Sequence, residues 1–438
     1  MIENIFHRSK KNNFVYDIGI TTIAQILIMF CSFAINKIVC VNLSVADYAI
    51  YNIIRRTASV ITYIMLLAMG IAVPKYLSAA KEEYNKEKFS LYLFVSIEIV
   101  FVMSALTSVV IIIYKVPMAQ VIFSKNSYTY LNTIIPMSIY AIGSAFTTYV
   151  FSYYRAVGAF IKYSVSQLAV QLFMLISSFF LGCNLLAIIY IWGIGSCIYA
   201  FFSLGMFVKE NWIADCFFNR EKKSKVRKEL LEYCLPRVPG EAILFAFNLV
   251  PVLIITNKYG LVDSSYFSAA TSINSMITSL FGFVGVVLLP EVSKSIVNHK
   301  LKSVNKNISY LLILYIILSF VAIGFVELFP AFIVQILFQK EYENAIPMIR
   351  IVVLSVIPHA FYLLYRNPLD AISKVPYNTV CLTISLCVMV VSMLFSTSLL
   401  ICEISYVLSY MVLGILCWVF WQWNFKKLVH TNSKESNE

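Results

Sequence analysis

The chain has 438 residues, of which 60% are hydrophobic and 13% are charged. Soluble domains carry about 25% charged residues, so this composition excludes a soluble globular protein. The formal net charge of +12 would suit a nucleic-acid partner if the cations formed one stripe, but they lie in short connections between apolar runs. The sequence therefore predicts an all-α integral membrane protein without a nucleic-acid partner.

Twelve apolar runs are long enough to cross a membrane, for which about 20 residues are needed. They form two groups of six around a basic connection and cover residues 14–40, 58–79, 89–114, 131–153, 163–182, 185–208, 236–257, 268–290, 310–329, 346–365, 378–399 and 402–423. This order predicts two pseudo-symmetric six-helix bundles around a central cavity. The expected domains are an N-terminal bundle (1–208), a basic cytoplasmic linker (209–229), a C-terminal bundle (230–425) and a short cytoplasmic tail (426–438).

The distribution of Lys and Arg predicts the orientation of these helices. If the N-terminus is cytoplasmic, the cytoplasmic segments hold 25 of the 34 Lys and Arg residues and the outside segments hold 7. Cytoplasmic connections are enriched in these residues, so we predict that both termini are cytoplasmic. The first apolar run is too long for a signal peptide and lacks a small-residue cleavage site, so we expect a retained first helix.

Weak internal matches indicate that the two groups are copies of one unit. Asn36-Lys37 is predicted to close the first helix and Asn257-Lys258 the seventh, and Asp47 and Asp263 follow in the next connections. Two copies of six helices run in the same direction through the membrane. We therefore expect a pseudo-two-fold axis along the membrane normal, with the substrate site between the halves.

Charged side chains inside hydrocarbon cost about 2.5–3.5 kcal/mol each on insertion scales, so each one is a candidate for function. Arg55 and Arg56, where the second helix is expected to enter from outside, either snorkel to the interface or face the cavity. The candidate cavity cations are Lys37, Arg55, Arg56, Arg237 and Lys258, and the candidate coupling or gating acids are Asp17, Glu98 and Glu241.

Arg237 has two candidate acidic partners, and Glu98 has two interpretations. Arg237 and Glu241 are four apart on one helix and could neutralise each other. Alternatively, the repeat places Asp17 opposite Val238, so that Asp17 and Arg237 could close an inner gate across the halves. Glu98 is predicted near the middle of a helix, either as a protonated acid bound to a neighbouring helix or as the coupling site for a proton or cation.

Residues that support enzyme or metal chemistry are scattered or missing. The ten cysteines include no Cys-x-x-Cys pair and the four histidines do not cluster, so the sequence predicts no metal site and no disulfide framework. No Walker A, Gly-x-Ser-x-Gly or His-Glu-x-x-His motif occurs. We therefore expect a protein that is not an enzyme and needs no cofactor, with coupling to H+ or Na+ left open.

Four stretches of the sequence resemble one family of transporters. They are Leu235-Pro236-Arg237-Val238-Pro239-Gly240, Gly-Leu-Val-Asp-Ser-Ser-Tyr-Phe-Ser-Ala-Ala at 260–270, Asp-Tyr-Ala-Ile-Tyr at 47–51 and Gly-Ile-Ala-Val-Pro-Lys-Tyr at 70–76. Together with twelve helices in two halves, they are similar to the Wzx-type polysaccharide flippases of the multidrug/oligosaccharidyl-lipid/polysaccharide (MOP) flippase superfamily. Ala49 and the pair Ser264-Ser265 depart from the glycines that are common there, which concerns the geometry of the outer turns.

The resemblance implies translocation of an undecaprenyl-diphosphate-linked oligosaccharide repeat unit from the inner to the outer leaflet of the plasma (inner) membrane by alternating access. The product would feed a surface polysaccharide such as O-antigen, the outer part of lipopolysaccharide, or capsule. Implied partners are this lipid-linked substrate, membrane lipids, and the polymerase and chain-length proteins of the same pathway. Arginine suits the diphosphate through its planar fork.

Two other functions are compatible with the helix count. A multidrug or organic-cation antiporter of the same superfamily would favour acidic residues in the cavity. A membrane glycan polymerase or ligase would need a larger outside loop than any in this chain.

Overall fold

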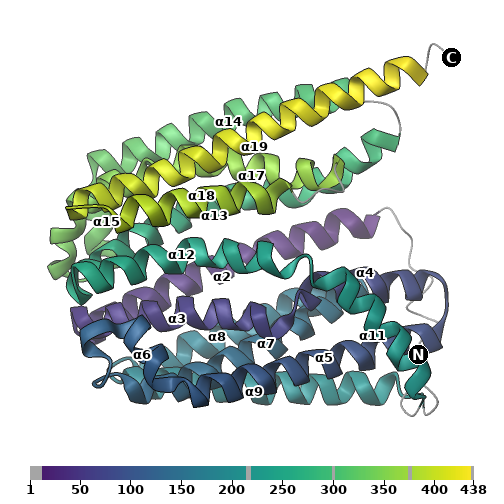
Figure 1. Ribbon diagram of the computed structural model, residues 1–438, viewed down its shortest axis with the longest axis horizontal. Helices are drawn as coiled ribbons and strands as arrows, with labels where there is room; N and C mark the ends of the chain where they lie inside the picture. Colours follow the sequence, from purple (N-terminus) through teal and green to yellow (C-terminus); the bar gives the residue numbers. More distant parts are fainter. Residues whose placement is uncertain (1–11, 214–218, 298–300, 373–376, 436–438) are drawn as a thin grey trace. The chain divides into compact units, whose positions relative to one another are not determined.

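The computed structural model describes residues 12–213, 219–297, 301–372 and 377–435. Within these ranges the regular structure is entirely helical, which confirms the predicted all-α class (Figure 1). Ten of the described helices are long and apolar enough to cross a membrane, and a bent pair, Lys340–Val353 with Val356–Arg366, raises the number to eleven. The chain is therefore a multi-pass membrane protein.

The chain forms two compact units, Met1–Asp47 with Ile54–Ala242 and Tyr48–Ile53 with Ile243–Glu438. The division thus falls after the basic connection and not within it. The helix of that connection, α11 (Arg220–Cys234), belongs to the first unit. The linker predicted at 209–229 is consequently part of the structure of the first unit over the residues that α11 covers.

The apolar runs predicted in the first half form the helices of the first unit. They are α2 (Asn12–Asn42), α3 (Val45–Leu66) continued by α4 (Met69–Glu82), α5 (Lys86–Ile113), α7 (Ile134–Ala156), α8 (Phe160–Leu181) and α9 (Leu185–Glu210), with the shorter α6 (Lys115–Phe123), η1 (Ser124–Asn126) and η2 (Leu131–Thr133) between them. α2 packs on α8, and α7 packs on α9. The second contact depends on glycine, because a Cβ on Gly143 would lie 2.7 Å from the carbonyl oxygen of Gly193.

The second unit repeats this order of helices. It contains α12 (Val238–Lys258), α13 (Leu261–Val297), α14 (Leu301–Leu328), α15 (Pro330–Leu337), η3 (Lys340–Ala345), α16 (Ile346–Val353), α17 (Val356–Ile372), α18 (Tyr377–Leu394) and α19 (Leu399–Glu435). α17 packs on both α13 and α19. The span predicted at 268–290 lies within α13, whose side chains from 282 onward are outside the described part of the chain.

Three predicted cavity cations lie inside helices and not in the first outside connection. α2 runs on to residue 42 and α3 already begins at residue 45, so Lys37 is in α2, and Arg55 and Arg56 are in α3. The expected start of the second helix at 58 was therefore wrong. α3 begins early because Ser44 caps it: its side-chain oxygen accepts a hydrogen bond from the Asp47 amide at 3.1 Å.

The helix ends define the register of the internal repeat. Asp47 and Asp263 are each the third residue of their helix, α3 and α13. The helices before them, α2 and α12, end at Asn42 and Lys258, the same number of residues before each aspartate. Lys258 therefore corresponds to Asn42, and the predicted correspondence of Lys258 with Lys37 was wrong.

The second membrane span is irregular where α3 meets α4. Leu67 and Ala68 both have a left-handed backbone, with φ of 47° and 57°, although neither is glycine and both are buried. Such a conformation costs about 1–3 kcal/mol per residue and persists only where the surrounding packing enforces it. Further along, Pro74 has no N–H to donate to the carbonyl of Gly70, four residues earlier in α4.

Candidate functional site

A cluster of charged side chains joins the linker helix α11 to α5. The Glu98 carboxylate lies 2.8 Å from the Lys223 ammonium and 2.5 Å from the Arg227 guanidinium. Nearer the start of α5, Glu87 forms an ion pair with Lys222. Neither sequence interpretation of Glu98 included these partners, which are more than a hundred residues away. Glu98 is a compensated carboxylate at a helix contact.

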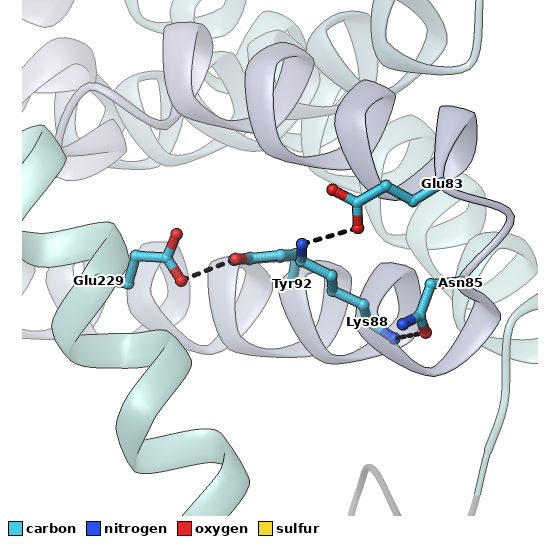
Figure 2. Close-up of polar contacts among 5 residues, drawn as sticks. All are labelled: Glu83, Asn85, Lys88, Tyr92 and Glu229. Atoms are coloured by element: carbon cyan, nitrogen blue, oxygen red, sulfur yellow. Dashed lines mark hydrogen bonds and ion pairs between the residues drawn. The ribbon is translucent and has the colours of Figure 1, made fainter.

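Hydrogen bonds between neutral and charged groups extend this contact, as Figure 2 shows. The Tyr92 hydroxyl of α5 donates to the Glu229 carboxylate of α11 at 2.7 Å. Lys88 bridges back to Glu83 at the end of α4 at 2.8 Å, while its backbone N–H donates to the capping side chain of Asn85. The first turns of α5 are thus tied both to α4 and to the linker helix.

Two cations share the ring of Tyr233, in the last turn of α11. The Lys75 ammonium, from α4, lies 3.9 Å from the ring centroid, and the Arg237 guanidinium lies 3.7 Å from it. Arg237 also donates to the Tyr233 carbonyl oxygen at 2.8 Å. Both cations are exposed. A second ring, that of Tyr76, packs edge-on against Tyr233 at 5.4 Å.

Among the described residues Arg237 forms no ion pair within 4.0 Å, so the predicted pair with Glu241 is not formed, while the pair with Asp17 stays a prediction. The side chain of Asp17 is outside the described part of the chain, and Glu241 lies in the first turn of α12. The repeat register defined by the helix ends places Asp17 opposite Tyr233 and not opposite Val238. Asp17 and Arg237 therefore do not occupy neighbouring positions of the repeat.

Arg55 lies among the helices of the first unit. Its Nη1 donates to the side-chain oxygen of Asn36 in α2 at 3.0 Å, and its guanidinium lies 6.0 Å from the ring centroid of Trp192 in α9. Arg55, Arg56 and Lys37 are all half-buried. Arg55 is therefore a cation within a membrane span that contacts the polar side chain of a neighbouring helix.

Lys258 has a structural role in the second unit. Its ammonium donates to the carbonyl oxygens of Met393, Leu394 and Ser396 at 2.9, 2.6 and 3.1 Å. These carbonyls lie at and beyond the C-terminal end of α18, where the helix leaves them without intrahelical partners. An ammonium has three donors, and these three carbonyls use all of them. Lys258 is therefore no longer a candidate substrate-binding cation.

One buried acid of the second unit, Glu403, was not among the candidates from the sequence. Glu403, in the second turn of α19, is only 5% exposed, and Asp263, in the first turn of α13, is close enough to interact with it electrostatically. Glu327 of α14, by contrast, lies 3.3 Å from the Arg350 guanidinium of α16. Glu403 is the second residue of the last apolar run, predicted at 402–423.

In the first turn of α3, Asp47 accepts hydrogen bonds from two hydroxyl groups. The Ser44 hydroxyl donates at 2.7 Å and the Tyr130 hydroxyl at 2.9 Å. Burial raises the pKa of Tyr130 to about 12, and the hydrogen bond to the Asp47 carboxylate adds to this shift. The start of α3 is thereby held against the segment between η1 and η2, which contains Tyr130.

The described residues contain no group of three or more His, Cys, Asp or Glu side chains that could hold a metal ion. The candidate site consists of cations, aromatic rings and compensated carboxylates in the first unit, where α4, α5 and α11 meet.

Sequence comparisons give no relatives for this chain. No protein-family model matches it, and a search among curated proteins finds no similar sequence.

Solved structures with the same fold do exist. The chain is similar to an inward-facing multidrug resistance MATE family transporter of the MOP superfamily, with a TM-score of 0.73 and 11% identity over 93% of this chain and 96% of that one. It is also similar to a MOP superfamily transporter from Pyrococcus furiosus, described as having a binding pocket of reverse polarity (TM-score 0.64, 14% identity, 94% and 95% covered). A third is the eukaryotic MATE transporter AtDTX14 (TM-score 0.62, 12% identity, 94% and 99% covered). This chain therefore has the fold of MATE transporters of the MOP superfamily.

Proposed function

We propose that the chain is a flippase that moves an undecaprenyl-diphosphate-linked oligosaccharide from the inner to the outer leaflet of the plasma membrane by alternating access. The fold supports a transporter, since the solved structures that share it are described as transporters. The sequence resemblance to Wzx-type flippases supports the polysaccharide substrate. Membrane lipids and the polymerase and chain-length proteins of the same pathway are its proposed partners.

One observation favours an anionic substrate over a cationic drug. Glu98, near the middle of α5, and Glu327, in the last turn of α14, are already compensated by Lys223, Arg227 and Arg350. A carboxylate that is ion-paired within the protein offers little attraction to a second cation. A site for cationic drugs would need acids that are still available.

The proposal is tested by following the lipid-linked repeat unit in cells. Cells that lack this protein should accumulate the repeat unit on the inner leaflet, and wild-type protein should restore its exposure on the outer leaflet. A variant with Arg55→Gln should restore the exposure of the repeat unit only in part, because it lacks a half-buried cation of the first unit. A normal distribution between the leaflets in cells without the protein would refute the flippase function.

A second candidate function is a multidrug or organic-cation antiporter. Of the three solved structures named above, two carry the MATE name, and one is described as a multidrug resistance transporter. The buried carboxyl of Glu403 near Asp263 favours this candidate, because a proton or an organic cation would relieve their repulsion. In everted vesicles, ethidium uptake that is driven by a proton or sodium gradient and lost in Glu403→Gln would support the antiporter.

A further inference from the structure

The site around Tyr233 combines two cations from different segments of the first unit. Lys75 comes from α4, and Arg237 from the turn between α11 and α12. The ammonium and the guanidinium lie 3.9 and 3.7 Å from the same ring centroid, so at most 7.6 Å separates them. The ring holds both cations in place by cation–π attraction.

The donors of these cations are only partly used inside the protein. One N–H group of Arg237 binds the Tyr233 carbonyl, and a guanidinium carries five donors in total. Among the described residues, neither Lys75 nor Arg237 forms an ion pair with a carboxylate within 4.0 Å. Both are exposed, so the remaining donors can reach a ligand.

The surroundings add further positive potential. α12 begins at Val238, directly after Arg237, and the N-terminus of a helix attracts anions through its free N–H groups and its dipole. The carboxylates near Tyr233 in the sequence include Glu229, which accepts the hydroxyl of Tyr92, Glu232, which pairs with Lys228, and Glu241, in the first turn of α12. A guanidinium and an ammonium on one aromatic ring beside a helix N-terminus provide the chemistry that binds phosphate.

We propose that Lys75, Tyr233 and Arg237 form a binding site for the diphosphate of a polyprenyl-linked substrate. The site rests on the proposed flippase function and specifies which atoms recognise the substrate. Two linked phosphates can bridge the two cations, one at the ammonium and one at the fork of the guanidinium. Lys75 lies in a Lys-rich segment that is predicted to be cytoplasmic, and Arg237 follows the basic linker. The site would therefore capture the substrate on the cytoplasmic side, before translocation.

The site also explains the position of the motif Leu235–Gly240. Pro236 and Pro239 flank Arg237, and the turn between α11 and α12 occupies residues 235–237. Proline restricts φ and so limits the conformations of this turn. Arg237 is consequently presented from a stiff connection against a ring of the linker helix, which reduces the entropy lost when phosphate binds.

A binding experiment with purified full-length protein tests the site. The protein is placed in phosphatidylcholine nanodiscs, and the binding of farnesyl diphosphate, farnesyl monophosphate and inorganic pyrophosphate is measured by microscale thermophoresis. We expect farnesyl diphosphate to bind at least tenfold more tightly than the monophosphate. Lys75→Gln and Arg237→Gln should each weaken the binding of the diphosphate about tenfold, and Tyr233→Leu should weaken it because both cations lose their support.

The matched control is Lys228→Gln, which removes a cation from the same linker helix. The side chain of Lys228 is 79% exposed and pairs with Glu232 at 3.8 Å. Its replacement should change the affinity less than twofold, and melting temperatures should show that all variants are folded. Equal weakening by Lys228→Gln, or undiminished binding by both Lys75→Gln and Arg237→Gln, would overturn the site.

Two further arms identify the source of the phosphate. Pyrophosphate that binds more weakly than farnesyl diphosphate, and is lost in the same variants, supports a site for lipid-linked diphosphate. Nanodiscs with phosphatidylglycerol that abolish the binding would assign the site to ordinary lipid headgroups and overturn the proposal. The assay contains no translocation step, so a failed flippase test with intact, variant-sensitive binding would refute the proposed function without touching the site.

Discussion

Arg155, in the last turn of α7, donates a hydrogen bond of 3.0 Å to the carbonyl oxygen of Gly70 in α4. This carbonyl lacks its helical partner because Pro74 has no N–H. The Ser152 hydroxyl also donates to it, at 3.3 Å. A side chain of one membrane helix thus satisfies the backbone of another, just after the left-handed residues Leu67 and Ala68.

Arg155→Gln should therefore lower the melting temperature, by a loss of about 1 kcal/mol in stability. In a Pro74→Ala background the restored N–H can bind the Gly70 carbonyl, so the same replacement should have a smaller effect. Thermal melts of the four proteins in one detergent measure this difference. Lys162→Gln, an exposed cation at the start of α8, is the control and should be neutral. Equal losses in both backgrounds would show that Arg155 acts elsewhere.

The ion pair between Glu98 and Arg227 should be worth about 0.5–1 kcal/mol, because both side chains remain partly exposed. A double-mutant cycle of Glu98→Gln and Arg227→Gln measures this coupling through melting curves. The control cycle uses Glu221 and Lys225 on α11, whose side chains are 81% and 77% exposed, and it should give a coupling near zero.

The same variants distinguish the two roles of Glu98 in transport. If Glu98 serves to attach α11, the double variant should retain more activity than Glu98→Gln, since only one of the two cations paired with Glu98, Lys223, is left without its carboxylate. If Glu98 carries the coupling ion, both variants should be inactive in a gradient-driven assay.

The contact between Tyr130 and Asp47 should depend on pH in the alkaline range only. Burial and the Asp47 carboxylate raise the pKa of Tyr130 to about 12, above its usual value near 10. A raised folded-state pKa gives stability that is complete below pH 10 and is lost as the pH rises through 12. Tyr130→Phe should thus lower the melting temperature by a constant amount below pH 10, and the difference should shrink above it. Tyr128→Phe, at a residue that is 76% exposed, should have no effect at any pH.

The predicted orientation places the connection between α8 and α9 outside the cell. Cys183 lies in this connection and is exposed. In a variant that keeps this cysteine alone, a membrane-impermeant maleimide should label intact cells. A cysteine at the exposed position Ser224 of α11 is the control and should react only after the membrane is opened. Labelling with the opposite pattern would invert the topology.

Much of the fold follows from local properties of the sequence. The apolar runs predicted at 89–114, 163–182 and 185–208 correspond closely to α5, α8 and α9, because the length of an apolar run alone decides whether a helix can span a membrane. The internal repeat was also visible, although its register around Lys37 was wrong. The basic pair Arg55 and Arg56 indicated a connection between helices, whereas α3 begins ten residues before this pair, after its capping residue Ser44.

The partners of the charged residues were decided by tertiary structure. Glu98 had no partner near it in the sequence, and α11 brings Lys223 and Arg227 to it across more than a hundred residues. Lys258 was identified as a cavity cation, but the end of α18 uses its donors. Hydropathy is a sum over neighbouring residues and can be read along the chain. The interaction of two charges depends on a distance between helices, which only the packed fold provides.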